Sequence, residues 1–201
     1  MMPADGLENS PETGGGAMPF PADAGAVLLP LARAAIASEL GAKARAAAID
    51  HPWLRENGAC FITLMLESKL RGCIGTLRAH RPLAEDVRAN AVGAAFRDPR
   101  FSPLGANELP GVQVEVSLLS PLEPIRFDGE ADALRQLRPG VDGLVLEYGR
   151  HTSTFLPQVW ENIQAPGDFL AHLKYKAGLP PDFWDADVRL SRYTVSKWRE
   201  A

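Results

Sequence analysis

The sequence predicts an α+β fold, and two features of its hydrophobic pattern support this class. Segments 59–76 and 144–156 each contain two short apolar runs around a two-residue turn, which is the pattern of a β-hairpin. Helical patterns are scattered among these strands and do not alternate with them regularly. Because βαβ units would require that alternation, we expect a mostly antiparallel sheet with flanking helices.

The first predicted helix covers residues 21–40, where apolar residues recur at three- and four-residue steps. Pro30 lies within it. A proline either kinks a helix or occupies the first turn of a shorter one, and the pattern leaves both alternatives open. A second helix is predicted over 82–96, where acidic residues suit the positive N-terminal end. Asp98-Pro99 ends that helix.

The first hairpin joins strands 59–66 and 70–76 through Glu67-Ser68, although two-residue turns favour glycine. A turn at this place pairs Cys73 with Ile62 and Arg71 with Leu64. Cys60 and Cys73 would then lie diagonally on one face, near enough to interact. A slip of one residue would break this arrangement.

The remaining elements follow from alternation and from turn residues. Strict alternation predicts a half-buried strand over 112–119. The other predictions are a short helix at 131–137, the hairpin strands 144–148 and 152–156, a helical turn at 159–163, a helix at 168–177 and a final strand at 188–195.

Composition and charge limit the classes of function. The chain has 201 residues and a net charge of -4, with no lysine or arginine before Arg33. Beyond the four acidic residues of that leading part, 21 acidic residues face 21 basic ones. No run rich in lysine or arginine occurs, so nucleic-acid binding is disfavoured. Residues 1–20 are rich in glycine, proline and alanine and predict a disordered tail before a domain at 21–201.

A cytoplasmic location is the simplest expectation. The longest apolar stretch, residues 24–32, is far shorter than a bilayer span, and the chain start is acidic, unlike that of a secretory signal. The two cysteines lack CxxC spacing and are too few for a disulfide scaffold.

The segment Leu70-Arg71-Gly72-Cys73-Ile74-Gly75 is the strongest candidate site. Residues two apart on a strand project from one face, so Arg71 and Cys73 would point the same way. A neighbouring cation favours the thiolate of a cysteine. Gly72 and Gly75 would let another group approach the backbone closely.

Cys73 has two interpretations. A free cysteine usually just packs, which makes a structural role the more frequent one. A nucleophile needs a base within reach, and His151, at the start of a predicted strand, is the best candidate among four scattered histidines.

Arg71 also has two interpretations. An arginine between apolar neighbours needs a carboxylate, a phosphate or solvent. It could form a structural salt bridge, with Glu115 or Glu147 as partner, or bind an anionic group in a cleft.

Arg97 and Arg100 would extend such an anion site, unless Asp98 neutralises them in a local network. Glu115 lies on the polar face of its strand, where solvent exposure is the default. If that face lines a cleft, Glu115 becomes the most credible acid or base.

Thr154, Gln158 and Trp160 could line a pocket, although aromatic residues there would serve equally well as core. No metal-ligand spacing or phosphate-loop spacing occurs, so we expect neither a metal site nor a cofactor.

Six motifs in order resemble the AMMECR family, and more narrowly its bacterial members, called AmmeMemoRadiSam system protein A. The resemblance covers roughly residues 24–198. The motifs are LRGCIG, RPLAEDVRANAVGAAFRDPRF, VEVSLLSPLEPI, LRPGVDGLVLEYG, TFLPQVW and FLAHLKYKAGLPPDFW.

The resemblance implies a single domain with a larger and a smaller lobe around a cleft, to which the LRGCIG strand contributes. It implies Memo-like and radical S-adenosylmethionine proteins as partners, but no agreed reaction. Two features depart from the family pattern, Pro30 and the turn without glycine.

Two classes of function are compatible with these observations. In the first, the cleft binds a small anionic molecule and modifies it, with Arg71 as anchor and Cys73 or Glu115 as the chemical group. In the second, the protein is a non-catalytic adaptor whose LRGCIG hairpin is purely structural. The sequence does not decide whether the protein is an enzyme.

Overall fold

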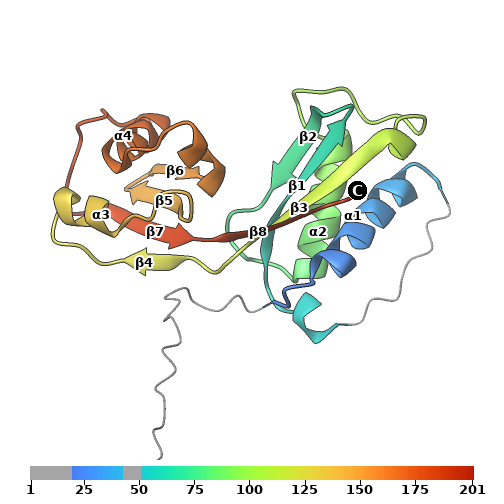
Figure 1. The fold of residues 1–201 in the computed structure, drawn as a ribbon, viewed down its shortest axis with the longest axis horizontal. Helices are drawn as coiled ribbons and strands as arrows, with labels where there is room; N and C mark the ends of the chain where they lie inside the picture. Colours follow the sequence, from blue (N-terminus) through green and yellow to red (C-terminus); the bar gives the residue numbers. More distant parts are fainter. Residues whose placement is uncertain (1–19, 43–50) are drawn as a thin grey trace, which may run out of the picture.

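The computed structural model describes residues 20–42 and 51–201, which form two lobes around two four-stranded sheets (Figure 1). All strand pairs are antiparallel, so the predicted α+β class is confirmed. Of the tail predicted at 1–20, residues 1–19 lie outside the described part. Phe20 packs its ring against Trp53, with ring centroids 6.1 Å apart.

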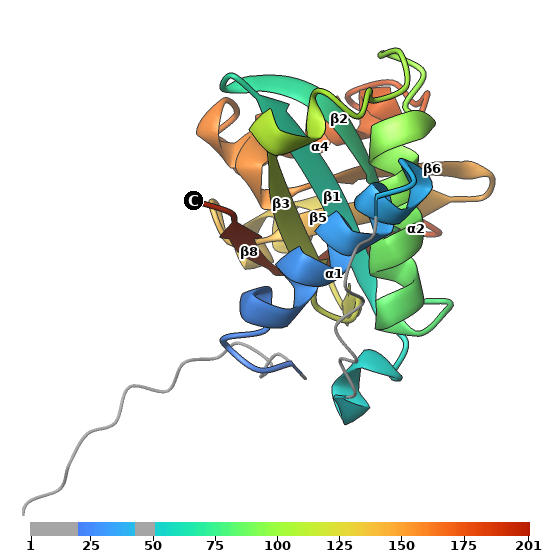
Figure 2. The same ribbon diagram turned by 90° about the vertical axis from the view of Figure 1, so that its right-hand side faces the viewer.

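The larger lobe contains sheet 1, in the order β2-β1-β3-β8. Two long helices cover one face of this sheet, as Figure 2 shows. The strands are β1 (Ala59–Leu66), β2 (Lys69–Gly75), β3 (Val112–Leu119) and β8 (Val195–Arg199). The helices are α1 (Gly25–Glu39) and α2 (Leu83–Phe96), with short 3-10 turns η1 (Pro52–Leu54) and η2 (Leu109–Gly111).

The two faces of sheet 1 differ in polarity. On β1, Cys60, Ile62 and Leu64 face the helices and are fully buried. Phe61 and Thr63 alternate with them and are half-buried on the opposite side. We call this side, which α1 and α2 do not cover, the open face. The period of two therefore separates an apolar core from a face available for function.

Pro30 lies inside α1, beyond its first turn, and the helix continues to Glu39. The alternative in which Pro30 opens a shorter helix is therefore wrong. Leu28, Leu31 and Ile36, which the helical pattern predicts as one stripe, are buried in the core.

The first hairpin turns where the sequence predicts it. Glu67 and Ser68 have φ values of 50° and 63°, both in the left-handed region. Positive φ at both central positions is what a tight turn between right-twisted strands requires. Here glutamate and serine, rather than glycine, adopt the positive φ values.

The register of this hairpin corrects the prediction. A bulge at Leu64/Met65 leaves Arg71 without a partner, so Cys73 pairs with Thr63 and not with Ile62. Cys73 therefore lies on the open face, whereas Cys60 faces α2. The Cys60 thiol donates to Asp86 Oδ2 at 3.3 Å, and burial raises its pKa well above the usual value. The two cysteines do not share a face.

The smaller lobe contains sheet 2, in the order β4-β7-β5-β6. The second hairpin is confirmed, and the predicted helices are present with slightly shifted ends. The strands are β4 (Glu123–Ile125), β5 (Gly143–Tyr148), β6 (His151–Phe155) and β7 (Arg189–Tyr193). The helices are α3 (Glu130–Gln136) and α4 (Pro166–Lys176), with a 3-10 helix η3 (Pro157–Glu161).

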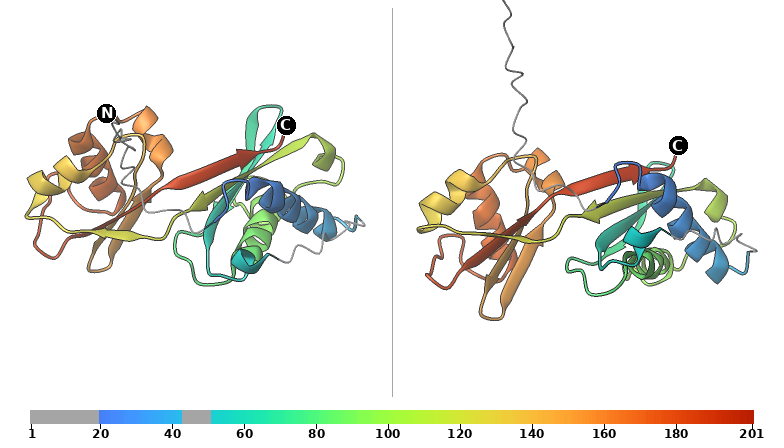
Figure 3. Two further views of the ribbon diagram at one scale, coloured as in Figure 1. Left: turned by 60° about the horizontal axis from the view of Figure 1, so that its bottom comes forward. Right: turned by 90° about the horizontal axis from the view of Figure 1, so that it is seen from below.

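The predicted final strand, 188–195, corresponds to β7, and a further strand, β8, follows it without having been predicted. β7 belongs to sheet 2, whereas β8 begins at Val195 and belongs to sheet 1. Figure 3 shows the two as one long run that crosses from the smaller lobe to the larger. The chain passes between the lobes in the other direction from β3 to β4.

The junction between the lobes is mainly apolar and includes an ion pair. Ala59, Leu119, Val145 and Tyr193 form a buried cluster there. Burial raises the pKa of Tyr193 to about 12, and its hydroxyl donates to the carbonyl of Phe155. Arg78, after β2, pairs with Glu147 on β5 at 2.6 Å. The smaller lobe thus packs against one end of the open face. Within the described ranges, no helix is both long and apolar enough to cross a membrane.

Candidate functional site

A row of polar side chains crosses the open face of sheet 1. Cys73 on β2 lies opposite Thr63 on β1, which lies opposite Glu115 on β3, which in turn lies opposite Arg199 on β8. Neighbouring strands are about 4.8 Å apart, so Cys73 and Glu115 are separated by about two such spacings. The structure thus places two predicted site residues on one surface.

The thiol of Cys73 has no base beside it among the described residues. Thr63 Oγ1 donates to its sulfur at 3.3 Å. His151 belongs to sheet 2, where its Nδ1 lies 2.8 Å from the carbonyl oxygen of Ala177 and its ring stacks on Tyr148. The structure therefore does not bring His151 and Cys73 together as a catalytic pair.

The backbone of Cys73 is closed by the loop that follows α2. Asp98 Oδ2 accepts from the Cys73 N–H at 2.8 Å, and Arg100 donates to the Cys73 carbonyl at 3.2 Å. Asp98 and Arg100 also pair at 2.7 Å. The hydrogen bonds from Arg100 and from Cys73 lower the pKa of Asp98. Arg97 is exposed, and no carboxylate of the described residues pairs with it.

Arg71 forms an internal salt bridge, with a partner that the sequence did not indicate. Its Nε and Nη2 bind both carboxylate oxygens of Glu108, at 2.8 and 3.0 Å. Its Nη1 donates to the carbonyl of Ser102 at 2.9 Å. The bond from Arg71 and the backbone bond from Gly105 lower the pKa of Glu108 to about 2.

The partners suggested for Arg71, Glu115 and Glu147, are both engaged elsewhere. A guanidinium that already binds a carboxylate with two nitrogens has little left to offer an external anion.

The two signature glycines do permit close approach, but by the protein itself. A Cβ at Gly72 would lie 2.1 Å from the backbone oxygen of Ala94 in α2. A Cβ at Gly75 would lie 2.2 Å from the ring of Phe61. Gly72 therefore lets α2 pack against β2, and Gly75 accommodates an aromatic ring on the open face.

Glu115 is buried rather than solvent-exposed, so the default expectation for it is wrong. It is 5% exposed and lies between two basic residues of β8. Arg199 Nη2 is 2.6 Å from Glu115 Oε2, and Lys197 Nζ is 3.1 Å from Oε1. Ser117, opposite Lys197, is also buried. One carboxylate therefore serves two cations.

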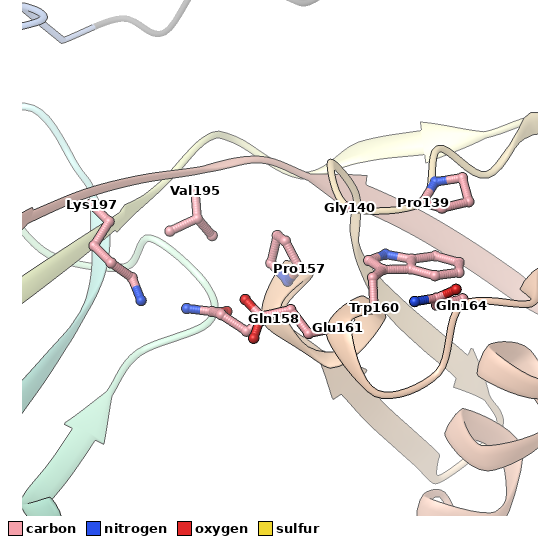
Figure 4. Close-up of a pocket in the computed structure, with 9 residues that line it drawn as sticks. All are labelled: Pro139, Gly140, Pro157, Gln158, Trp160, Glu161, Gln164, Val195 and Lys197. Carbon is pink, nitrogen blue, oxygen red and sulfur yellow. The ribbon is translucent and has the colours of Figure 1, made fainter. Parts of the chain in front are cut away.

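A pocket of about 660 Å³ begins at Lys197 (Figure 4). One wall is β8, and the opposite wall comes from η3 and the loop after α3. Figure 4 shows Lys197 and Gln158 extending toward each other from the two walls. Gln158 Oε1 is buried and accepts no hydrogen bond from the described residues. The lining residues are Pro139, Gly140, Pro157, Gln158, Trp160, Glu161, Gln164, Val195 and Lys197.

Sequence reasoning found part of this pocket. Of the three predicted pocket residues, Gln158 and Trp160 line it. Thr154 does not, and its hydroxyl bonds to the carbonyl of Leu144 and to the hydroxyl of Tyr193. Lys197 was missed because the predicted last strand stopped at Val195. The available signal was the pair Lys197 and Arg199 around Trp198, which a strand places on one face. The signature strand does not line this pocket.

Within the described residues, no group of three or more histidine, cysteine or acidic side chains could hold a metal ion.

A two-lobed α+β domain with a pocket between its lobes is thus the class of protein that the structure defines. The AMMECR1 family profile matches residues 29–198, and the chain belongs to this family.

Archaeal relatives support the assignment. A protein of Methanothermobacter thermautotrophicus is 38% identical over 190 residues, which cover 90% of this chain and 97% of the relative. One of Methanocaldococcus jannaschii is 39% identical over 153 residues, covering 72% of this chain and 74% of the relative. A crystal structure of an uncharacterized protein from Pyrococcus horikoshii matches with a TM-score of 0.77 and 35% identity, over 89% of this chain and 92% of that one.

Proposed function

We propose that this AMMECR1-family protein binds a small anionic ligand in the pocket between its lobes, with Lys197 as the anchor. The observation that carries the proposal is the position of the Lys197 side chain, which is 39% exposed and lines a pocket of about 660 Å³. That volume lies in the range of small-molecule sites.

Charge supports an anionic group on the ligand. Lys197 and Arg199 share the single carboxylate of Glu115, so this cluster has one positive charge in excess. An ammonium that shares its counter-ion gains more from a second anion than one with a carboxylate of its own.

The opposite wall indicates a second property of the ligand. The exposed carboxylate of Glu161 lines this wall and only accepts hydrogen bonds. A hydroxyl or amino group on the ligand would donate to it. The ligand class is therefore a small anion that also carries hydrogen-bond donors.

The predicted anchor role shifts from Arg71 to Lys197 in this proposal, because Glu108 already occupies Arg71. Arg97 stays an accessory candidate, whereas Arg100 is held by Asp98. Glu115 acts as the group that positions Lys197. No base lies beside the Cys73 thiol among the residues that the structure describes, so we do not assign it a nucleophilic role.

The resemblance of the motifs to bacterial AmmeMemoRadiSam system protein A supports a further part of the proposal. The protein would act with a Memo-like protein and a radical S-adenosylmethionine protein, as members of that type are named for. The ligand would then be handed to or received from these partners.

A second candidate function is that of a non-catalytic adaptor. It is favoured by the signature hairpin, whose polar groups bind within the protein: Arg71 to Glu108, and the backbone of Cys73 to Asp98 and Arg100. In this alternative LRGCIG is a structural element only.

Titration with anions tests the first proposal. Inorganic phosphate, succinate and serine are added while the amide and indole signals of Gln158 and Trp160 are followed by NMR. We expect saturable shifts with at least one probe, weakened about tenfold or more by Lys197→Met because a charge-assisted hydrogen bond is lost.

Lys69→Met removes an exposed lysine at the far edge of the same sheet and serves as the control. Shifts that persist unchanged in Lys197→Met, or that no probe produces, would contradict the proposal. The adaptor function would be favoured if both variants co-purify with the Memo-like and radical S-adenosylmethionine proteins while no anion shifts the NMR signals.

A further inference from the structure

We infer that the unpaired edge of β8 is a docking site for an extended segment of a partner protein. The segment would add to sheet 1 as a further antiparallel strand, with acidic residues alternating with apolar ones. Backbone hydrogen bonds give affinity in this mode of binding, and pockets for alternate side chains give specificity.

The backbone of β8 leaves every second residue unpaired. β8 is the last strand of sheet 1 and pairs only with β3. Ser120 N donates to Thr194 O at 2.9 Å, and Glu200 N donates to Val114 O at 3.0 Å. Even-numbered residues therefore bond to β3. Because the direction alternates along a strand, Val195, Lys197 and Arg199 direct their N–H and C=O groups away from β3.

No backbone group of the described residues bonds to these outward groups. Exposed strand edges of this kind are usually protected by charged side chains. Here the two charged side chains on the edge, Lys197 and Arg199, turn inward to Glu115 on β3. Among the described residues, nothing pairs with this edge, and a strand of another chain can add to it.

Each face of β8 adjoins a pocket. On the open face, Val195 and Lys197 line the pocket of about 660 Å³ between the lobes. On the helix side, Ser196 and Trp198 line a pocket of about 410 Å³, together with Lys197 and the segment 20–22. An added strand would present successive side chains to the two faces in turn, so both pockets would receive side chains.

The chemistry of the two faces defines the segment. The open face offers Lys197 and Arg199 with one shared carboxylate, which favours an acidic side chain. The helix side offers the rings of Trp198 and Phe20, which favour an apolar one. The proposal thus goes beyond binding of a small anion, because it rests on the backbone of β8 and on the second pocket as well.

A labelled peptide tests the inference. The probe is an end-capped, fluorescein-labelled peptide of alternating aspartate and valine, roughly seven residues long so that it spans β8. We expect binding in fluorescence polarisation with the full chain. A peptide with lysine in place of aspartate should bind at least about tenfold more weakly.

Backbone methylation gives the sharpest readout. In antiparallel addition, the residues whose amides face β8 carry their side chains on the same face as Lys197, so they are the aspartates. Methylating the aspartate amides should abolish binding, whereas methylating the valine amides should leave it within about twofold. Equal tolerance of both modifications overturns strand addition.

Two variants separate the components of the site. Val195→Pro removes one outward N–H but no hydrogen bond to β3, so the fold should persist while peptide binding falls. Lys197→Met should reduce the preference for aspartate over lysine. Lys69→Met is the matched control. A failure of anion binding with intact peptide binding would contradict the small-ligand proposal alone.

Absence of peptide binding in the unmodified protein overturns the inference. So does a dimer in light scattering that dissociates in Val195→Pro, because a second copy would then be the occupant of the edge.

Discussion

The two edges of sheet 1 differ, because the backbone of the β2 edge is hydrogen-bonded to a loop and that of the β8 edge is not. At the β2 edge, the loop after α2 covers the backbone, since Asp98 and Arg100 bind the N–H and the C=O of Cys73. At the β8 edge, Lys197 and Arg199 turn inward to Glu115, and the outward backbone groups have no partner among the described residues.

This difference shows that the most distinctive sequence motif need not contain the groups that are free to bind a ligand or a partner. Two arginines in and around LRGCIG bind carboxylates of the protein itself: Arg71 binds Glu108, and Arg100 binds Asp98. Among the described residues, the unpaired backbone edge and Lys197, the cation that lines the pocket, lie three strands away on β8. The LRGCIG motif therefore lies at an edge whose polar groups bind within the protein, whereas the groups proposed for recognition lie on β8, which has no such motif.

The largest expected effect concerns the glycine that lets α2 press against β2. In Gly72→Ala the new Cβ would meet the backbone oxygen of Ala94 at 2.1 Å, and neither backbone can move away cheaply. We expect a loss of about 3 kcal/mol or more in the free energy of unfolding, measured in urea.

Gly167→Ala is the control, because its Cβ would meet nothing within 4 Å. Gly25→Ala, whose Cβ would meet the Trp198 side chain near the β8 edge, should cost less than Gly72→Ala since a side chain can shift. If Gly72→Ala and Gly25→Ala lower the free energy of unfolding by the same amount, the two edges are equally rigid and the proposed difference between them is wrong.

Acid should weaken the β2 edge. The pKa of Glu108 falls from 4.5 to about 2 in the folded protein, so its ionised form contributes stability that is fully present above pH 4.5. That contribution is lost as the pH falls from 4.5 to about 2. In thermal unfolding, Glu108→Gln should therefore show a smaller fall in Tm over this range than the wild type.

Asp98, whose pKa is also lowered, acts in the same direction and remains in that variant. An unchanged slope in Glu108→Gln would show that the Arg71–Glu108 fork adds no stability.

The smallest effect is local and distinguishes the edges directly. Amide hydrogen exchange should be slow at Cys73, whose N–H binds Asp98, and fast at Lys197, whose N–H faces outward. Asp98→Ala should speed exchange at Cys73 by roughly tenfold or more and leave Lys197 unchanged. Protection at Lys197 in the unmodified protein would mean that its edge is already occupied.

The sequence alone predicted most of the elements because their signals are local. Alternation marked β3, apolar runs around a two-residue turn marked the two hairpins, and the helical period with Asp98-Pro99 marked α2. It missed β4, which has three residues, and β8, of which only Val195 falls within the predicted last strand. Nothing in the local pattern shows that the chain continues there into a strand of the other sheet.

The candidate site was predicted less well. The sequence found Cys73 and Glu115 for the open face, and Gln158 and Trp160 for the pocket. It could not find Glu108 as the partner of Arg71, because that choice depends on where the loop before β3 folds back onto β2. Lys197 was not predicted either, because its role depends on the pocket that it forms with the smaller lobe.

The sequence by itself determined the α+β class, the place of the first turn, the motifs of the family and the alternation that creates a polar face. The tertiary structure decided which face each side chain joined. One bulged residue, Arg71, put Cys60 and Cys73 on opposite faces of sheet 1. The physical reason is that period and turn chemistry act within a few residues, whereas register, ion-pair partners and free edges depend on segments that meet only in the folded chain.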